Sequence, residues 1–86
     1  MPYELKHSKQ CIKFLNKHPH IKQRVLESLR LIALDPYNAP LDIKKLAGTS
    51  NRYRLRISKY RVLYEVRESE ILIYAYRAEV RGDVYK

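Results

Sequence analysis

The sequence predicts an α+β domain in which an antiparallel sheet carries an N-terminal two-helix hairpin on one face. Apolar residues recur with helical spacing through the first half of the chain, and with a period of two in three later segments, residues 52–57, 60–67 and 71–76. The short breaks between those segments make neighbouring strands antiparallel. With a first strand at residues 2–6, the expected order of elements is β-α-α-β-β-β.

The two expected helices are separated by a proline. Ser8 can cap the first helix, whose apolar face comprises Cys11, Ile12, Phe14 and Leu15. Pro19 ends this helix and can open the next. From His20 to Leu34, apolar residues recur on one helical stripe, namely Ile21, Val25, Leu29 and Ile32. Asp35-Pro36 ends the second helix, and residues 41–48 lead from the following loop to a glycine turn.

The stretch YRLRISKYRVLYEV, residues 53–66, carries arginine at most of its polar positions. Alternation along a strand places Tyr53, Leu55 and Ile57 on one face and Arg52, Arg54 and Arg56 on the other. The apolar set must pack under the helices, so the arginines point away from them. By the same alternation Arg61 joins them, while the tyrosines of this stretch belong to the core.

Composition limits the classes of protein. The chain has 86 residues, which is room for a single domain spanning residues 1–86. Its net charge is +9 and its only cysteine is Cys11. No apolar run is long enough to cross a membrane, and we expect a cytoplasmic protein without a disulfide. Such a charge is typical of proteins that bind nucleic acid or an acidic partner, although it can also serve only to keep a protein dispersed.

The arginine cluster is the feature that points to a function. Arginine binds phosphate through two parallel hydrogen bonds and stacks on bases, so three or four arginines on one sheet face favour RNA or another polyanion over a merely solvated basic face. Motifs for metal, nucleotide or redox chemistry are missing from the sequence. His7 and Cys11, or His18 and His20, are poor candidates for metal ligands.

The residues resemble the RelE/ParE superfamily of bacterial and archaeal toxins. The resemblance rests on the basic alternating strand, on Tyr60-Arg61-Val62-Leu63-Tyr64, on the lead-in Lys45-Leu46 with Gly48, and on the terminal RGDVYK. It implies a RelE-like fold and the toxin half of a type II toxin–antitoxin pair, held inactive by an acidic, RelB-like antitoxin encoded beside it. RelE-type members cut messenger RNA in the ribosomal decoding site through the RNA's own 2′-hydroxyl, without metal or cofactor. ParE-type members share the fold but poison DNA gyrase, which is the alternative function.

Carried over by position, the resemblance implies five catalytic residues: Arg54, Arg56, Arg61, Arg81 and Tyr85. Around them we expect four further residues to contact RNA: Lys45, Arg52, Lys59 and Arg77. Arg77 is also an alternative to Arg81 as the late catalytic arginine. Arg54 and Arg56 stand where RelE has lysines, and arginine is a poor general base. The base therefore stays open between Glu79, for which a surface salt bridge is the preferred interpretation, Tyr85, and no protein base at all.

Overall fold

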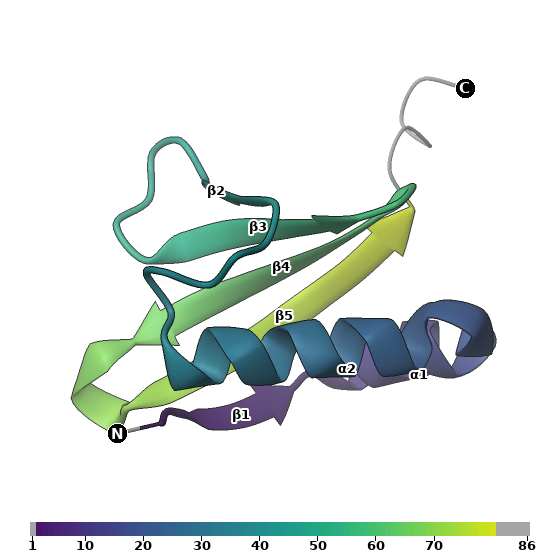
Figure 1. Cartoon of the computed structure of the whole chain (residues 1–86), viewed down its shortest axis with the longest axis horizontal. Helices are drawn as coiled ribbons and strands as arrows, with labels where there is room; N and C mark the ends of the chain where they lie inside the picture. Colours follow the sequence, from purple (N-terminus) through teal and green to yellow (C-terminus); the bar gives the residue numbers. More distant parts are fainter. Residues whose placement is uncertain (1, 81–86) are drawn as a thin grey trace.

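The computed structural model describes residues 2–80 of the chain. A sheet forms one layer and two helices the other (Figure 1). In chain order the elements are β1 (Glu4–His7), α1 (Lys9–Lys17), α2 (Pro19–Leu34), β2 (Ile43–Lys45), β3 (Arg52–Ile57), β4 (Tyr60–Arg67), the 3-10 turn η1 (Glu68–Glu70) and β5 (Leu72–Val80). The helix hairpin and the three long strands confirm the predicted α+β class.

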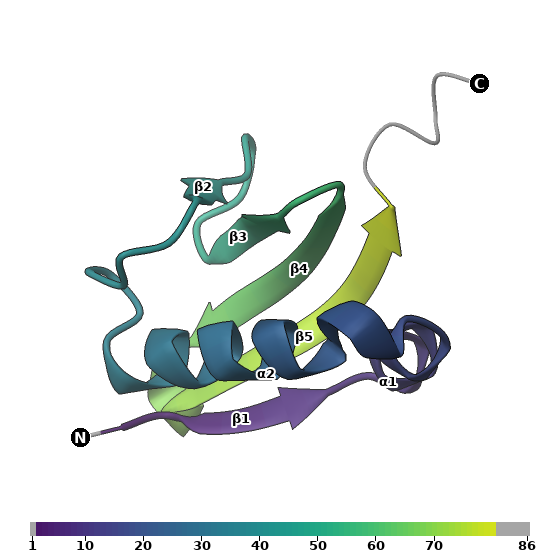
Figure 2. The same cartoon turned by 45° about the vertical axis from the view of Figure 1, so that its right-hand side comes forward.

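The sheet is mixed, whereas the sequence predicted a wholly antiparallel one. Its strand order is β1-β5-β4-β3-β2, and β1 runs parallel to β5 while the other neighbours are antiparallel (Figure 2). Short turns dictate the antiparallel pairs because each turn reverses the chain. No short turn links β1 to β5, since the helices and three strands separate them, so local sequence does not determine their direction.

Two strands differ in extent from the prediction. Residues 43–45 form β2, an additional edge strand within the segment that was predicted only to lead to a glycine turn. β5 continues to Val80, past the expected end at residue 76, and its pairing with β4 shifts register at Leu63/Tyr64. This bulge interrupts the alternation of apolar and polar residues. The alternation therefore predicts a strand that ends before the real end of β5.

The core lies between the helices and one face of the sheet. All four residues of the predicted α2 stripe are buried, as are Cys11 and Leu15 of α1. From the sheet, Leu55, Ile57, Tyr60, Val62, Tyr64 and Val66 are buried against them. The alternation in β3 and β4 was therefore interpreted correctly, and it leaves their arginines on the face that carries no helix.

Helix α1 begins where β1 ends and continues along the exposed edge of β5. Ser8 caps the helix as expected, with its hydroxyl accepting a hydrogen bond from the Cys11 amide at 3.1 Å. The Gln10 side chain then bonds the backbone of Ala78 in both directions, at 2.8 and 2.9 Å, much as a neighbouring strand would. These contacts fix α1 beside the C-terminal half of β5.

None of the helices in residues 2–80 has the length and apolar composition that crossing a bilayer requires.

Candidate functional site

Six arginines gather on the face of the sheet that the helices leave open. We call this set the arginine surface, and its members are Arg52, Arg54 and Arg56 on β3, Arg61 and Arg67 on β4, and Arg77 on β5. Strand register places them in rows across the sheet: Arg56 lies opposite Arg61, and Arg54 lies opposite Leu63, which in turn lies opposite Arg77. Three strands thus bring together arginines that are up to 25 residues apart.

Three carboxylates divide the arginine surface into pairs. Asp42 accepts from Arg56 at 2.7 Å and contacts Arg54 at 3.4 Å. Glu79 accepts from Arg77 at 2.7 Å and also from Arg61. The arginines could be predicted from the sequence but this pairing could not, because two of the acids lie on neighbouring strands and Asp42 precedes β2.

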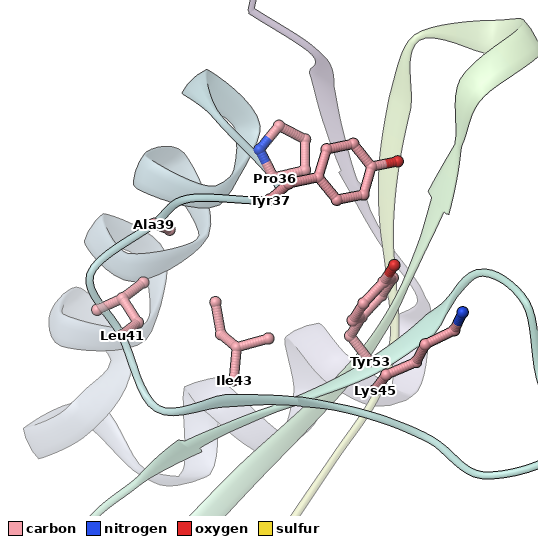
Figure 3. Close-up of a pocket in the computed structure, with 7 residues that line it drawn as sticks. All are labelled: Pro36, Tyr37, Ala39, Leu41, Ile43, Lys45 and Tyr53. Carbon is pink, nitrogen blue, oxygen red and sulfur yellow. The ribbon is translucent and has the colours of Figure 1, made fainter.

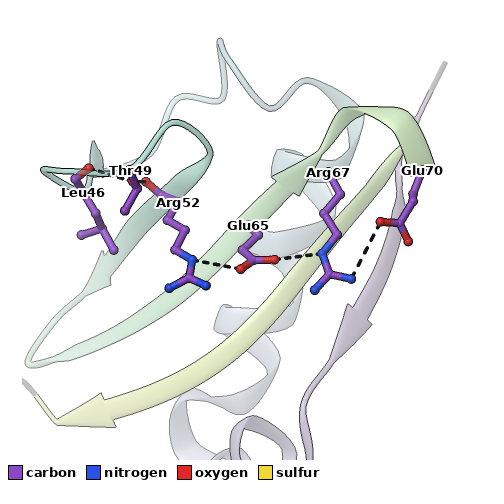
Figure 4. Close-up of polar contacts among 6 residues, drawn as sticks. All are labelled: Leu46, Thr49, Arg52, Glu65, Arg67 and Glu70. Carbon is purple, nitrogen blue, oxygen red and sulfur yellow. Dashed lines mark hydrogen bonds and ion pairs between the residues drawn. The ribbon is translucent and has the colours of Figure 1, made fainter.

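The third carboxylate, Glu65, lies between the two remaining arginines (Figure 4). It accepts a hydrogen bond from Arg52 at 2.9 Å and one from Arg67 at 2.8 Å. Arg67 also approaches Glu70 at 3.9 Å. Burial raises the pKa of Glu65, but the hydrogen bonds and charges of Arg67 and Arg52 outweigh that effect and hold its pKa below the ordinary value. Glu65 therefore stays ionised and fixes two guanidinium groups.

Arg56 and Arg61 lie directly opposite each other on neighbouring strands and form a row of like charges. Like charges directly opposite each other on neighbouring strands destabilise a sheet. Here Glu79 lies opposite Arg61 on one side, and the backbone amide of Arg56 bonds the carbonyl of Asp42 on the other. The two carboxylates therefore flank the pair and offset its repulsion, while each guanidinium keeps further N–H donors for another anion.

Arg54 is the least exposed arginine of the set, with 20% of its side chain accessible. Its Nε is buried and has no hydrogen-bond partner among residues 2–80. A buried guanidinium donor without a partner is costly, and a change of side-chain rotamer that turned this donor toward an anion on the open face would relieve that cost.

Glu79 is a poor candidate for the general base. Burial raises its pKa, but hydrogen bonds from Arg77 and Arg61 outweigh burial and hold the pKa of this carboxyl below its ordinary value. A carboxylate with a lowered pKa is a weaker base, and both of its oxygens already accept from arginine. The structure therefore shows the salt bridge that the sequence analysis gave as the alternative for Glu79.

Aromatic rings lie beneath two of the arginines, which the sequence analysis did not foresee. The Arg52 guanidinium carbon lies 5.0 Å from the Tyr76 ring centroid, and that of Arg67 lies 4.8 Å from the Tyr74 ring. The bulge in β5 places Tyr76 on the same face as its neighbour Arg77. Such cation–π contacts, together with the hydrogen bonds to Glu65, restrict where each guanidinium lies.

The other predicted RNA-binding residues are dispersed. Lys45 lies opposite Tyr53 on the helix side of the sheet, where both line a cavity of about 260 Å³ together with Tyr37 and Ile43 (Figure 3). Its neighbour Lys44 lies opposite Arg54 and so belongs to the open face. Lys59 occupies the β3–β4 turn.

Arg81 and Tyr85, both predicted catalytic residues, lie outside the described residues. Within residues 2–80, no group of three His, Cys, Asp or Glu side chains is placed to hold a metal ion.

Comparison with known proteins identifies the family. A sequence model described as the ParE toxin of the type II toxin–antitoxin system parDE matches residues 5–77, which is most of the chain. The chain belongs to this family. None of the curated protein sequences matches it.

Solved structures place this ParE-family toxin within the wider RelE/ParE superfamily. It is similar to the archaeal RelE–RelB complex of Pyrococcus horikoshii, with 32% identity, a TM-score of 0.82, and coverage of 96% of this chain and 99% of that one. The toxin–antitoxin complex from Methanococcus jannaschii shares 32% identity at a TM-score of 0.72, with 92% and 93% covered. The isolated RelE toxin of E. coli, at 20% identity and a TM-score of 0.77, covers 96% and 90% and shares the fold.

Proposed function

We propose that this toxin is a RelE-like endoribonuclease that cleaves messenger RNA in the ribosomal decoding site, and hence in the cytoplasm. The observation that carries the proposal is the Arg56–Arg61 row, in which two guanidinium groups on neighbouring strands face solvent between flanking carboxylates. A phosphodiester presents its oxygens in the geometry that such forked donors match. The resemblance to RelE toxins supports the same substrate.

The chemistry would be transesterification. The 2′-hydroxyl of the RNA attacks the adjacent phosphorus, the bond to the 5′-oxygen breaks, and a cyclic phosphate and a free 5′-hydroxyl result. Arg56 and Arg61 would bind the phosphate and stabilise the added negative charge of the transition state. Arg54 would hold the neighbouring phosphate. Arg81 is proposed for the side of the leaving oxygen, and no metal takes part in this scheme.

Proton transfer from the 2′-hydroxyl is the step for which the described residues offer the least support. Glu79 is held by two arginines, which leaves Tyr85 as the proposed base or as a ring that stacks on a splayed base of the RNA. Orientation alone can supply several kcal/mol to such a reaction. A ribosome that holds the messenger RNA with its 2′-oxygen aligned for attack would therefore compensate for a weak base. The proposed dependence on the ribosome follows from this.

An acidic antitoxin is the proposed partner. Two of the three solved structures named above are RelE–RelB complexes. Acidic side chains of an antitoxin would exchange with Asp42 and Glu79 on the same guanidinium groups, because both kinds of carboxylate fit the arginine fork. A bound antitoxin that covers Arg56 and Arg61 would exclude the RNA. A crystal structure of the complex that leaves both arginines open and unmoved would contradict this inhibition.

A second candidate function is poisoning of DNA gyrase without catalysis. Two observations favour it: the matching family model is that of ParE toxins, and Glu79 is a poor candidate for the base because its two arginine partners lower its pKa. Arginine at positions 54 and 56, in place of RelE's lysines, points the same way. The two functions act on different processes, so one experiment separates them.

The deciding experiment is induced expression of the toxin, with separate measurements of translation and of DNA synthesis. Primer extension on a translated message, with and without ribosomes, should reveal cuts only when ribosomes are present. Arg61→Lys should abolish most cutting, since lysine cannot form the two parallel hydrogen bonds. The fold should survive, because Arg61 is only partly buried at the surface of the sheet and lysine keeps its charge beside Glu79; circular dichroism and the Tm of the variant check this. Arrest of DNA synthesis by a folded wild-type protein that makes no cuts would establish the gyrase function instead.

A further inference from the structure

A cluster of rings lies at one end of the molecule, outside the arginine surface. Rings from the start of β4 and from the corner between α1 and α2 contact one another there. Both segments lie at the end of the molecule where the described part of β5 ends (Figures 1 and 2). We call it the aromatic corner, and it consists of Phe14, His18, His20 and Tyr60, with Lys59 above Tyr60.

The rings hold one another in fixed orientations. Phe14 and His18 stack with centroids 4.2 Å apart, and Tyr60 meets His18 edge-on at 5.2 Å. Nδ1 of His18 lies 2.8 Å from the carbonyl oxygen of Phe14, so this nitrogen carries a proton and donates. Nε2 of His20 lies 3.0 Å from the Tyr60 hydroxyl. Tyr60 itself is buried, with 4% exposure, and anchors the exposed ring of His20.

An exposed ring held in this way is preorganised for stacking. Most exposed side chains lose rotamer freedom when they bind, which costs free energy. The hydrogen bond between His20 and Tyr60 has already restricted His20, so a ligand would meet a ring that is in place. Bases of single-stranded RNA stack on aromatic side chains, and histidine is among those used.

The charge around the aromatic corner is positive. Lys59 is exposed in the turn, and Lys17 is exposed in the last turn of α1. No acidic residue occurs in α1 or in the first turn of α2. This differs from the arginine surface, where carboxylates pair with every arginine. Within residues 2–80 neither lysine forms an ion pair with a carboxylate, so both can bind the phosphates on either side of a stacked base.

The aromatic corner also continues the arginine surface. Tyr60 immediately precedes Arg61, and Ile57 lies opposite Tyr60 one step beyond the Arg56–Arg61 row. An RNA strand bound on that row and passing over the β3–β4 turn would reach Lys59 and then His20. The two surfaces lie on opposite faces of the sheet, and the turn is the short path between them.

We propose that the aromatic corner is a second RNA subsite, which stacks one unpaired base on His20 and holds its phosphate through Lys59. The inference rests on the proposed function, since it extends the RNA path that begins at Arg56 and Arg61. Its ligand is single-stranded RNA, because a base within a duplex does not offer its face to a side chain.

The test measures binding of a short single-stranded oligoribonucleotide to the purified full-length toxin by fluorescence anisotropy. His20→Ala should weaken binding about tenfold, because loss of one stacked base has an effect of that size. His20→Phe should restore most of the affinity, since it keeps the ring. Lys59→Ala should reduce the slope of log affinity against log salt by about 0.7, the value for one phosphate contact on a single strand.

Arg30→Ala is the matched control, because Arg30 is exposed on α2 and its loss changes the net charge equally. It should leave the salt slope of the wild type unchanged. One outcome would contradict the subsite alone. In that outcome the wild type binds the RNA and Arg61→Lys weakens binding, but His20→Ala and Lys59→Ala bind as well as Arg30→Ala. If the wild type binds no RNA at all, the proposed function fails and the subsite with it.

Discussion

Each carboxylate beside the arginine surface has two opposing effects. Each carboxylate fixes the guanidinium groups beside it, and each also competes with phosphate for their N–H donors. Asp42 shows the competition most clearly, because its side chain is 45% exposed and lies against both Arg54 and Arg56. Exposed ion pairs contribute little to stability, so the larger effect of Asp42 should be on binding.

Replacing Asp42 with asparagine should therefore strengthen RNA binding. We expect an affinity about fivefold higher, since one unit charge about 4 Å away is worth about 1 kcal/mol in water. Anisotropy with a single-stranded oligoribonucleotide measures the change. Asp35→Asn is the control, because Asp35 is also exposed and, within residues 2–80, its carboxylate accepts hydrogen bonds from Asn38 and contacts no arginine. Equal gains in both variants would mean that net charge alone sets the affinity.

His7 is a residue whose protonation should affect stability. Its Nε2 is buried and lacks a partner among residues 2–80, and burial lowers its pKa below the ordinary 6.5. Below pH 6.5 the unfolded chain therefore binds this proton before the folded chain does, and stability falls as the pH falls. Glu65 and Glu79 have lowered pKa values too, but their contribution is lost only below the ordinary 4.5 of a glutamate.

The window between those two values isolates His7. The Tm of the wild type should fall as the pH is lowered from about 7 to about 5. His7→Leu should flatten this dependence and should be no less stable at neutral pH, because it replaces a buried polar atom without a partner by an apolar group. Thermal unfolding at several pH values measures both effects. A variant that loses as much Tm as the wild type over this range would show that other groups are responsible.

At the scale of elements, periodicity predicted the long strands well. The bounds of β3 and β4 agree with the sequence prediction, because alternation over six to eight residues with tyrosine and valine is a strong signal. The three residues of β2 are too few to show any alternation. Only the pairing of β2 with β3 shows which side chains of β2 lie on which face of the sheet. This pairing places two adjacent lysines on opposite faces.

That separation supplies a matched pair of variants. Lys44 lies opposite Arg54 on the open face, and Lys45 lies opposite Tyr53 on the other. If RNA binds the arginine surface, Lys44→Ala should weaken binding and reduce the salt slope by about 0.7, while Lys45→Ala should change neither. Both lysines are exposed, so the fold should tolerate both changes. A larger effect of Lys45→Ala would move the RNA to the helix side of the sheet.

The bulge in β5 marks the other limit of sequence reasoning at this scale. Regular alternation would direct Tyr76 and Arg77 to opposite faces. The register shift instead places Tyr76 under Arg52 while Arg77 pairs with Glu79. Bulges depend on tertiary packing as much as on local sequence, so the composition of this part of the site could not be read from the pattern. The direction of Arg54, Arg56 and Arg61, on strands without a bulge, could be.

For the molecule as a whole, the question is whether its charge of +9 acts through its sum or through its placement. Basic side chains also occur on the helices, where Lys9, Lys13 and Arg30 are exposed. A uniform field would attract RNA from every side and would be weakened equally by any lost charge. The arginine surface, by contrast, concentrates guanidinium groups from three strands on one face.

Two double variants with the same net charge distinguish these cases. Replacing Arg54 and Arg56 with alanine removes two charges from the arginine surface, and replacing Arg30 and Lys45 removes two from elsewhere. Because each phosphate contact on single-stranded RNA contributes about 0.7 to the slope of log affinity against log salt, the first variant should flatten the slope by about 1.4 units. The second should keep the wild-type slope and lose only a little affinity. Equal slopes in the two variants would contradict a localised site. The slope counts the phosphates that contact basic side chains, so only the loss of contacting side chains should reduce it.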